Sequence, residues 1–221
     1  MQLRKIQLKL STKTMTARGS KVVRCEQCLL PRDQCICQQK PQVTSHCAFC
    51  FVMYKGEYYK PSNTGRLIAD VVADNHAFLW SRVDPDPKLL TLLTNPAYAP
   101  MLVFPHQYAS AERCISSPSE LAAVNQGKIP LFVMLDGTWR EAIKMFKSPS
   151  LASLPVLGIQ PAEASTYQLR EAAHKHQLCT AEVAIEVLTL AQEEHTAQAL
   201  ATYFNVFRHA YAAGKPHLTL K

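Results

Sequence analysis

Short apolar runs alternate with amphipathic stretches from about residue 46 onward. The runs are bounded by proline, glycine or polar residues, as buried strands are, whereas Trp139, Ala142, Ile143 and Phe146 recur at helical spacing. This pattern predicts strands at 47–54, 77–80, 101–104, 131–135 and 156–159, and helices at 66–73, 88–93, 139–146, 180–191 and 197–213. Because strands that alternate with helices form parallel sheets, we expect an α/β fold with helices on both faces of the sheet.

The first 40 residues carry the positive charge of the protein. They hold nine Lys or Arg and two acidic residues, so their net charge of +7 equals that of the whole chain. A basic segment joined to a neutral body suits a polyanion such as RNA, although a solubilising tail has the same composition. We divide the chain into a mobile basic arm at 1–20, a cysteine-rich knuckle at 21–45 and a body at 46–221.

Several classes of protein are excluded by what the sequence lacks. No apolar run reaches the roughly 18 residues of a membrane span, so we expect no membrane partner. The basic N-terminus is not followed by an apolar stretch and cleavage site, so we expect a cytoplasmic protein without a signal peptide. With seven glycines and no G-x-G-x-x-G or G-K-[ST] motif, the chain has neither a Rossmann fingerprint nor a P-loop.

Six of the eight cysteines lie between residues 25 and 50. In a reducing compartment such a cluster indicates metal rather than disulfides. The spacing Cys25-x2-Cys28-x6-Cys35-x1-Cys37 predicts a tetrahedral zinc site of four thiolates, with reduced free thiols or a redox pair as the alternative. The knuckle contains few apolar residues, so we expect it to need the metal to fold and to lie outside the apolar core.

The other cysteines are predicted to be structural. Cys47 and Cys50 are three residues apart on a predicted strand, so their thiols point to opposite faces and do not converge on one ion. They are interpreted as small buried apolar residues. Cys114 and Cys179 stand alone in the sequence, and we assign them structural roles as well.

The sharpest local feature follows the buried run 131–135. The run ends in Asp136, Gly137, Thr138 and Trp139, and the tryptophan opens a predicted helix. Asp136 therefore lies at the carboxyl end of a strand, where parallel α/β proteins bind their ligands. Asp136 or Thr138 could instead cap the helix, and position alone does not separate the two roles.

Four motifs in order resemble the DTW-domain family and span about residues 24–215. They are the four-cysteine knuckle, Lys60-Pro-Ser-Asn-Thr-Gly-Arg66, Asp136-Gly-Thr-Trp139 and Cys179-Thr-Ala-Glu-Val-Ala184. The chain looks closest to the bacterial tRNA-uridine aminocarboxypropyltransferases. The resemblance implies a SPOUT-like knotted parallel sheet in the catalytic body, with the small zinc knuckle before it. One position departs from many relatives, which have histidine where this chain has Tyr54, three residues before Glu57.

The resemblance also implies a reaction, in which N3 of a tRNA uridine takes the 3-amino-3-carboxypropyl group of S-adenosylmethionine and methylthioadenosine is released. Asp136 is the candidate to accept or hydrogen-bond the N3 proton. Our candidates for the cofactor pocket are Gly137, Thr138, Trp139, Thr180 and Glu182. Our candidates for the pocket rim and for RNA phosphates are Asn63, Thr64, Arg66, Arg140 and Arg170.

Two other functions fit the same sequence. A SPOUT-like RNA methyltransferase would use the same cofactor and a similar pocket. A zinc-knuckle RNA-binding protein would need no catalysis, although the acid at the end of a buried strand argues against it. In each case the expected partner is RNA, and we expect no DNA partner.

Overall fold

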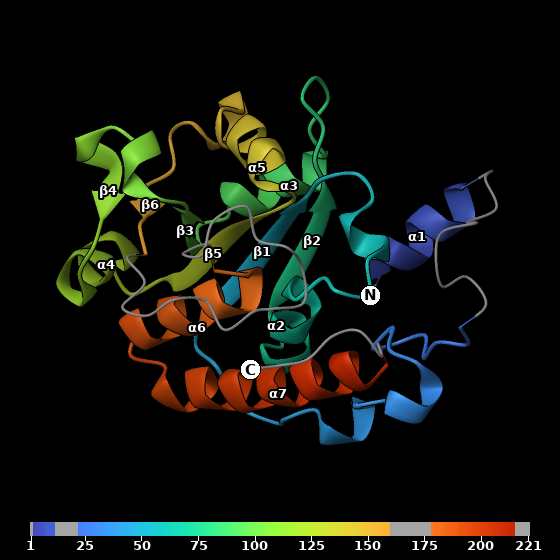
Figure 1. Cartoon of the computed structure of the whole chain (residues 1–221). Coiled ribbons are helices and arrows are strands. Elements are labelled where there is room, and N and C mark those ends of the chain that lie inside the picture. The colour runs from blue at the N-terminus through green and yellow to red at the C-terminus, as the bar shows by residue number, and fades with distance from the viewer. Residues whose placement is uncertain (1, 12–21, 160–177, 215–221) are drawn as a thin grey trace.

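A computed structural model describes residues 2–11, 22–159 and 178–214. Within these residues six parallel strands form one sheet in the order β2-β1-β5-β3-β6-β4, shown in Figure 1. The strands are β1 (Ala48–Met53), β2 (Asn75–Leu79), β3 (Tyr98–Val103), β4 (Cys114–Ile115), β5 (Ile129–Asp136) and β6 (Val156–Leu157). The predicted parallel α/β sheet is confirmed, and β5 lies near its centre, between β1 and β3.

Helices cover both faces of this sheet, as predicted (Figure 1). The helices are α1 (Gln2–Leu10), α2 (Gly65–Val71), α3 (Pro87–Leu93), α4 (Pro118–Asn125), α5 (Trp139–Phe146), α6 (Thr180–Leu190) and α7 (Glu194–Ala213). Residues of α2, α4, α6 and α7 share one apolar cluster, and residues of α3 and α5 share another. Among the described helices, none is both long and apolar enough to cross a membrane.

The two clusters arise from the alternation of side chains along the central strands. On β1, Phe49 and Phe51 belong to the cluster with α2, α6 and α7, whereas Cys50 belongs to the cluster with α3 and α5. Phe49 faces Phe132 of β5 in register, and their ring centroids are 5.4 Å apart. Because both faces are buried, these strands are apolar throughout, which is why they appear as continuous runs in the sequence.

The prediction for Cys47 and Cys50 is confirmed by this alternation. Cys47 belongs to the cluster on one side of the sheet and Cys50 to the cluster on the other. Both are buried, and burial raises the pKa of each thiol to about 12. They therefore pack as small apolar side chains rather than as a metal pair.

The sequence analysis missed β4 and α4. Helix α4 begins with a capping box, in which Ser117 and Glu120 satisfy each other's backbone N–H groups, and Pro118 occupies the first turn. This Ser-Pro-x-Glu pattern is a recognisable helix start that we did not use. Strand β4 has two residues, too short for a periodicity to appear.

The expected mobile arm is in part a helix. Residues Gln2–Leu10 form α1, Leu3 packs against the core, and Gln7 accepts a hydrogen bond of 3.4 Å from the Tyr58 hydroxyl. The apolar positions of α1 give it a face that can pack, which a purely charged arm would lack. Residues 12–20 of the predicted arm lie outside the described residues.

The knotted topology stays a prediction. The resemblance to the DTW-domain family implies that the C-terminal segment threads a loop and builds the cofactor pocket. The connection from β6 to α6 includes residues 160–177, which lie outside the described residues.

Candidate active site and metal centre

Asp136 ends the central strand β5 and is buried, with 4% of its surface exposed. Its backbone carbonyl accepts a hydrogen bond from the Tyr54 N–H at 2.8 Å, which continues the β1–β5 ladder to the edge of the sheet. Its side chain brings a carboxylate into the interior of the protein. A buried carboxylate must be hydrogen-bonded or paired, and this one is reached by a polar loop from another part of the chain.

Asn63 supplies that hydrogen bond. Its Nδ2 atom donates to Oδ2 of Asp136 at 2.7 Å, and both side chains are buried. Gly65, two residues on, lies so close that a Cβ atom there would be 3.0 Å from the same Oδ2 and 3.3 Å from Oδ1 of Asn63. Any larger residue would crowd the carboxylate, so Gly65 belongs to the site although we had not singled it out.

Thr64 ties the same loop to the first turn of α6. Its Oγ1 atom accepts a hydrogen bond of 3.2 Å from the Ala181 N–H, and Thr64 is buried. Of the eight polar or charged side chains buried within the described ranges, five belong to these two segments and the end of β5. They are Ser62, Asn63, Thr64, Asp136 and Glu182. Polar groups are thus concentrated at one place, at the carboxyl edge of the sheet.

The predicted pocket residues on α6 lie beside this loop. Thr180 is the first residue of the helix and is half-buried. Glu182 accepts a hydrogen bond from the Cys179 N–H at 2.8 Å and is buried, so it is not the surface residue that we considered as an alternative. Burial beside Glu182 raises the pKa of Cys179, which keeps this thiol protonated, in agreement with a structural role.

The turn after β5 shows which residue caps helix α5, a role that the sequence left open between Asp136 and Thr138. The N-cap of α5 is Thr138, whose backbone N–H and hydroxyl donate to Oε2 of Glu141 at 2.7 and 2.6 Å. Asp136 is therefore not the helix cap. Gly137 lies between them, and a Cβ atom there would be 3.1 Å from Cβ of Glu141. The capping box holds the strand-to-helix turn without using the Asp136 carboxylate.

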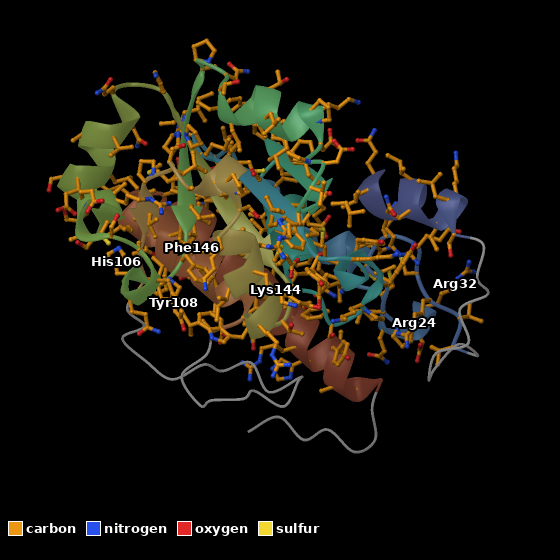
Figure 2. The ribbon with its side chains drawn as sticks, turned by 90° about the horizontal axis from the view of Figure 1, so that it is seen from above. Arg24, Arg32, His106, Tyr108, Lys144 and Phe146 are labelled. Carbon is orange, nitrogen blue, oxygen red and sulfur yellow. The ribbon has the colours of Figure 1, made fainter. Side chains whose placement is uncertain are left out.

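Trp139 lies in an aromatic group on the α3 and α5 face of the sheet. Its ring stacks on Phe104 with centroids 5.4 Å apart and meets the edge of Tyr108 at 5.7 Å, and 38% of the residue is exposed. Figure 2 shows Tyr108 and Phe146 beside each other in this group. The structure therefore places Asn63, Thr64 and Asp136 together, and places the Trp139 ring with other aromatic residues.

The three predicted arginines have different positions. Arg140 is exposed on the first turn of α5, and its contact with phosphate stays a prediction. Arg170 lies outside the described residues. Arg66, a candidate for the pocket rim, has all its guanidinium nitrogens buried, and the group lies over the ring of Phe207, 5.0 Å from the centroid, so its role at the rim stays a prediction.

Tyr54 and Glu57 lie near the end of β1. Tyr54 stands at the position where many relatives have histidine, and its ring stacks on Trp80 with centroids 5.5 Å apart. Glu57 begins the short 3-10 helix η3 (Glu57–Tyr59), is buried, and forms an ion pair with Lys60. This ion pair anchors the start of the loop that carries Asn63.

The four predicted metal ligands form one cluster. The Sγ atoms of Cys25, Cys28, Cys35 and Cys37 all lie within 4.8 Å of one another. Two pairs are 3.6 and 3.8 Å apart, from Cys25 to Cys37 and from Cys28 to Cys35. A tetrahedron with zinc–sulfur bonds of 2.3 Å has edges of about 3.8 Å, so the thiols fit a zinc ion.

The backbone of the knuckle is shaped for this cluster. The Cys25 N–H donates to the Leu30 carbonyl at 2.8 Å, and Leu29 adopts a left-handed conformation with φ 59°. The thiols differ in their pKa values. Burial opposes the Cys25 thiolate, but hydrogen bonds from the backbone of Cys28 and Gln27 outweigh it and help to lower its pKa to about 6. Such donors favour the thiolate, which is the form that binds metal.

The knuckle is not peripheral, contrary to our expectation. Leu30 and Ile36 are fully buried and belong to the same apolar cluster as Phe207 of α7. Gly214, after the end of α7, lies against Pro31, and a Cβ atom there would be 3.2 Å from the proline ring. The knuckle has few apolar residues, but they are placed where they complete the core, and sequence composition does not show this.

The fold and site together define a class of protein. It is a parallel α/β domain with a buried polar site at the carboxyl edge of its sheet and a four-thiol knuckle packed on its core. The family model of the DTW domain matches residues 22–212, and the chain belongs to this family. The DTW domain is associated with uridine modification in tRNA, which makes the chain a tRNA-modifying transferase. The match excludes the basic helix α1, and no solved structure matches the chain.

We predict that the double variant Cys35→Ser/Cys37→Ser loses its metal and is destabilised. Without the ion, the knuckle should release Leu30 and Ile36 from the core, at a cost of at least about 2 kcal/mol. In a protein of this size that corresponds to a Tm lower by roughly 4–8 °C. Metal analysis and thermal melting measure the two effects. Cys114→Ser, at an isolated thiol, should keep both the metal and the Tm, and an unchanged Tm in the double variant would restore the peripheral view of the knuckle.

Proposed function

We propose that this protein transfers the 3-amino-3-carboxypropyl group of S-adenosylmethionine to N3 of a uridine in tRNA. The observation that supports it most directly is the buried Asp136 carboxylate, held by Asn63 at the carboxyl end of the central strand in a member of a tRNA-modifying family. A carboxylate in this position has a cost that capping or packing does not explain, because Thr138 caps the following helix.

The chemistry requires alignment more than a strong base. A sulfonium has three electrophilic carbons, and the one that reacts is the one held in line with the nucleophile. In the proposed step, uridine N3 attacks the γ-carbon of the methionine moiety, a carbon–nitrogen bond forms, and the carbon–sulfur bond breaks. The electron pair stays on sulfur, so methylthioadenosine leaves as a neutral thioether.

Asp136 would act on the N3 proton. The imide N–H of uridine is weakly acidic, and N3 becomes a better nucleophile as this proton is polarised or removed. Asn63 fixes the orientation of the carboxylate, and Gly65 and Thr64 fix the loop that carries Asn63. The proton would pass to the carboxylate or stay hydrogen-bonded to it until solvent accepts it.

The remaining candidates would hold the co-substrate and the RNA. Gly137 and Thr138 follow Asp136 at the start of α5, and Thr180 and Glu182 lie at the start of α6, which Thr64 contacts. The Glu182 carboxylate would attract the α-amino group of the methionine moiety. Trp139 would contribute from the aromatic group at the edge of the pocket, and the exposed Arg140 would reach phosphate together with Arg170.

The four-cysteine knuckle would hold zinc in a structural role. Zinc bound by four thiolates has no open coordination position for substrate, so its contribution is to fold the knuckle onto α7. The folded knuckle would then present its basic residues to RNA. Figure 2 shows Arg24 and Arg32 together on the knuckle, and Arg32 is exposed.

Labelled co-substrate tests the reaction and separates it from methylation. The full-length protein is incubated with unmodified tRNA and S-adenosylmethionine labelled in either the carboxyl carbon or the methyl carbon. We expect tRNA to acquire the carboxyl label only, together with an equal amount of methylthioadenosine. Transfer of the methyl label would indicate the methyltransferase alternative, and failure to bind S-adenosylmethionine would indicate an RNA-binding protein without catalysis.

Asp136→Asn should abolish most of the activity without unfolding the protein. Asparagine keeps the size of the side chain and can still accept the Asn63 hydrogen bond, but it cannot take a proton. We expect transfer to fall by roughly two orders of magnitude or more, with Tm and tRNA binding close to the wild type. Modified uridine and methylthioadenosine are quantified together, so that hydrolysis of the co-substrate is not counted as transfer.

The control for this variant is Glu141→Gln at the same turn. Glutamine also forms capping boxes, so this change removes a carboxylate near the site while keeping the turn. It should retain transfer within a few-fold of the wild type. If a folded Asp136→Asn protein transferred the group at a near-normal rate, the catalytic assignment would be wrong.

The basic helix α1 gives a separate prediction about tRNA binding. Lys5→Gln/Lys9→Gln changes two exposed residues and should leave the contacts of Leu3 and Gln7 intact. If both lysines contact phosphates, the slope of log Kd against log salt should become shallower by about 1.5. The matched control is Lys88→Gln/Lys128→Gln, which has the same change of charge at other exposed sites. Equal salt slopes for the two variants would assign α1 to solubility alone.

A further inference from the structure

The buried guanidinium of Arg66 has no hydrogen-bond acceptor among residues 2–11, 22–159 and 178–214. Its Nε, Nη1 and Nη2 atoms are all buried, and within these described residues none of them has a hydrogen-bond partner. The guanidinium lies over the Phe207 ring, 5.0 Å from its centroid. The ring face attracts a cation, but it does not replace the hydrogen bonds that a guanidinium loses on leaving water. An anionic partner at this position would offset that loss.

The groups around Arg66 indicate which anion this is. Burial disfavours the charged guanidinium and lowers its pKa, and the groups that oppose this effect are Cys28, Asp70, Tyr203 and Cys37. Asp70 already forms an ion pair with Lys40, with 3.1 Å between Oδ1 and Nζ. Burial raises the pKa of the Tyr203 hydroxyl, which keeps it neutral, so the two knuckle thiols are the remaining anionic candidates among these four.

A zinc ion would convert these thiols into a strong anionic partner. Cysteine binds zinc as the thiolate, so four ligands around one divalent cation leave a net charge of about −2. This charge would lie next to the apolar core, since Cys28 is buried with Leu30 and Ile36. An excess of negative charge in such a place is costly unless a cation lies close to it.

We propose that Arg66 is the counter-ion of the zinc–thiolate centre and fastens the knuckle to the first turn of α2. Arginine suits this role because its planar guanidinium stays charged when buried and presents several N–H donors at fixed angles. The proposal concerns the metal centre and does not depend on which group the enzyme transfers.

The inferred contact connects the metal centre to the candidate active site through a very short piece of chain. Arg66 is adjacent to Gly65, which lies against Asp136, and three residues after Asn63, which donates to the same carboxylate. Thr64 lies between them and binds the start of α6. The knuckle thereby supports, through Arg66, the loop that positions the Asp136 side chain.

Zinc affinity tests the proposal in the full-length, zinc-loaded protein. Arg66→Met removes the charge and keeps a side chain of comparable length. We expect it to bind zinc roughly 10- to 100-fold more weakly in competition with a chelator of known affinity, the usual effect of removing a group that supports metal ligands. Arg66→Lys keeps the charge without the planar group, and its affinity should lie between those of Arg66→Met and the wild type.

Arg113→Met is the matched control for general destabilisation. Arg113 also stacks on a ring, with 5.6 Å from its guanidinium carbon to the Phe146 centroid, and it donates to the carbonyls of Leu151 and Leu154. Its loss should lower the Tm and leave zinc affinity unchanged, because its partners belong to the opposite face of the sheet.

Cobalt substitution supplies a readout that packing alone would not change. A cation beside a thiolate lowers the energy of its lone pairs, so removing Arg66 should shift the thiolate-to-cobalt charge-transfer band to longer wavelength. Arg113→Met should leave the band in place. The proposal is overturned if Arg66→Met keeps zinc affinity within about twofold of the wild type, if Arg66→Lys binds as weakly as Arg66→Met, or if the cobalt band does not move. A wild-type protein that binds no zinc would overturn the metal assignment itself.

Discussion

A buried hydrogen bond of 2.7 Å from the Asn63 amide to the Asp136 carboxylate joins two parts of the chain that are 73 residues apart. It brings the loop before α2 onto the carboxyl end of β5. Gly65 favours the approach, because a Cβ atom there would lie only 3.0 Å from the carboxylate. Thr64 then contacts α6, and Arg66 lies over Phe207 of α7. Four consecutive residues thus connect the central strand to both C-terminal helices.

The four-cysteine knuckle is part of the apolar core, which its sequence alone does not show. As a sequence it is a metal-binding appendage with few apolar residues. In the structure Leu30 and Ile36 close one end of the apolar cluster beside α7. Metal binding to such a segment contributes to the stability of the whole domain, because the ion holds together residues that the core needs.

In the turn after β5, one residue caps the following helix and its neighbour supplies the buried carboxylate. Thr138 and Glu141 form the capping box at the start of α5, so Asp136 is not needed as a helix cap. The carboxylate instead faces the loop of Asn63. A position that sequence reasoning could assign equally to a cap or a catalyst is resolved by the residue that actually caps the helix.

The sequence by itself determined the parallel sheet, its covering helices and the four-thiol cluster. Strand runs, helical spacing and cysteine spacing are local patterns that depend on few residues, although the short strand β4, the weakly amphipathic helix α4 and the helix α1 in the basic arm were missed. The tertiary structure alone decided that the Arg66 guanidinium is buried, that the knuckle completes the core, and that Asn63 contacts Asp136. The physical reason is that burial and pairing depend on which distant segments meet, and a charged residue has the same appearance in a sequence whether it faces water or an ion in the interior.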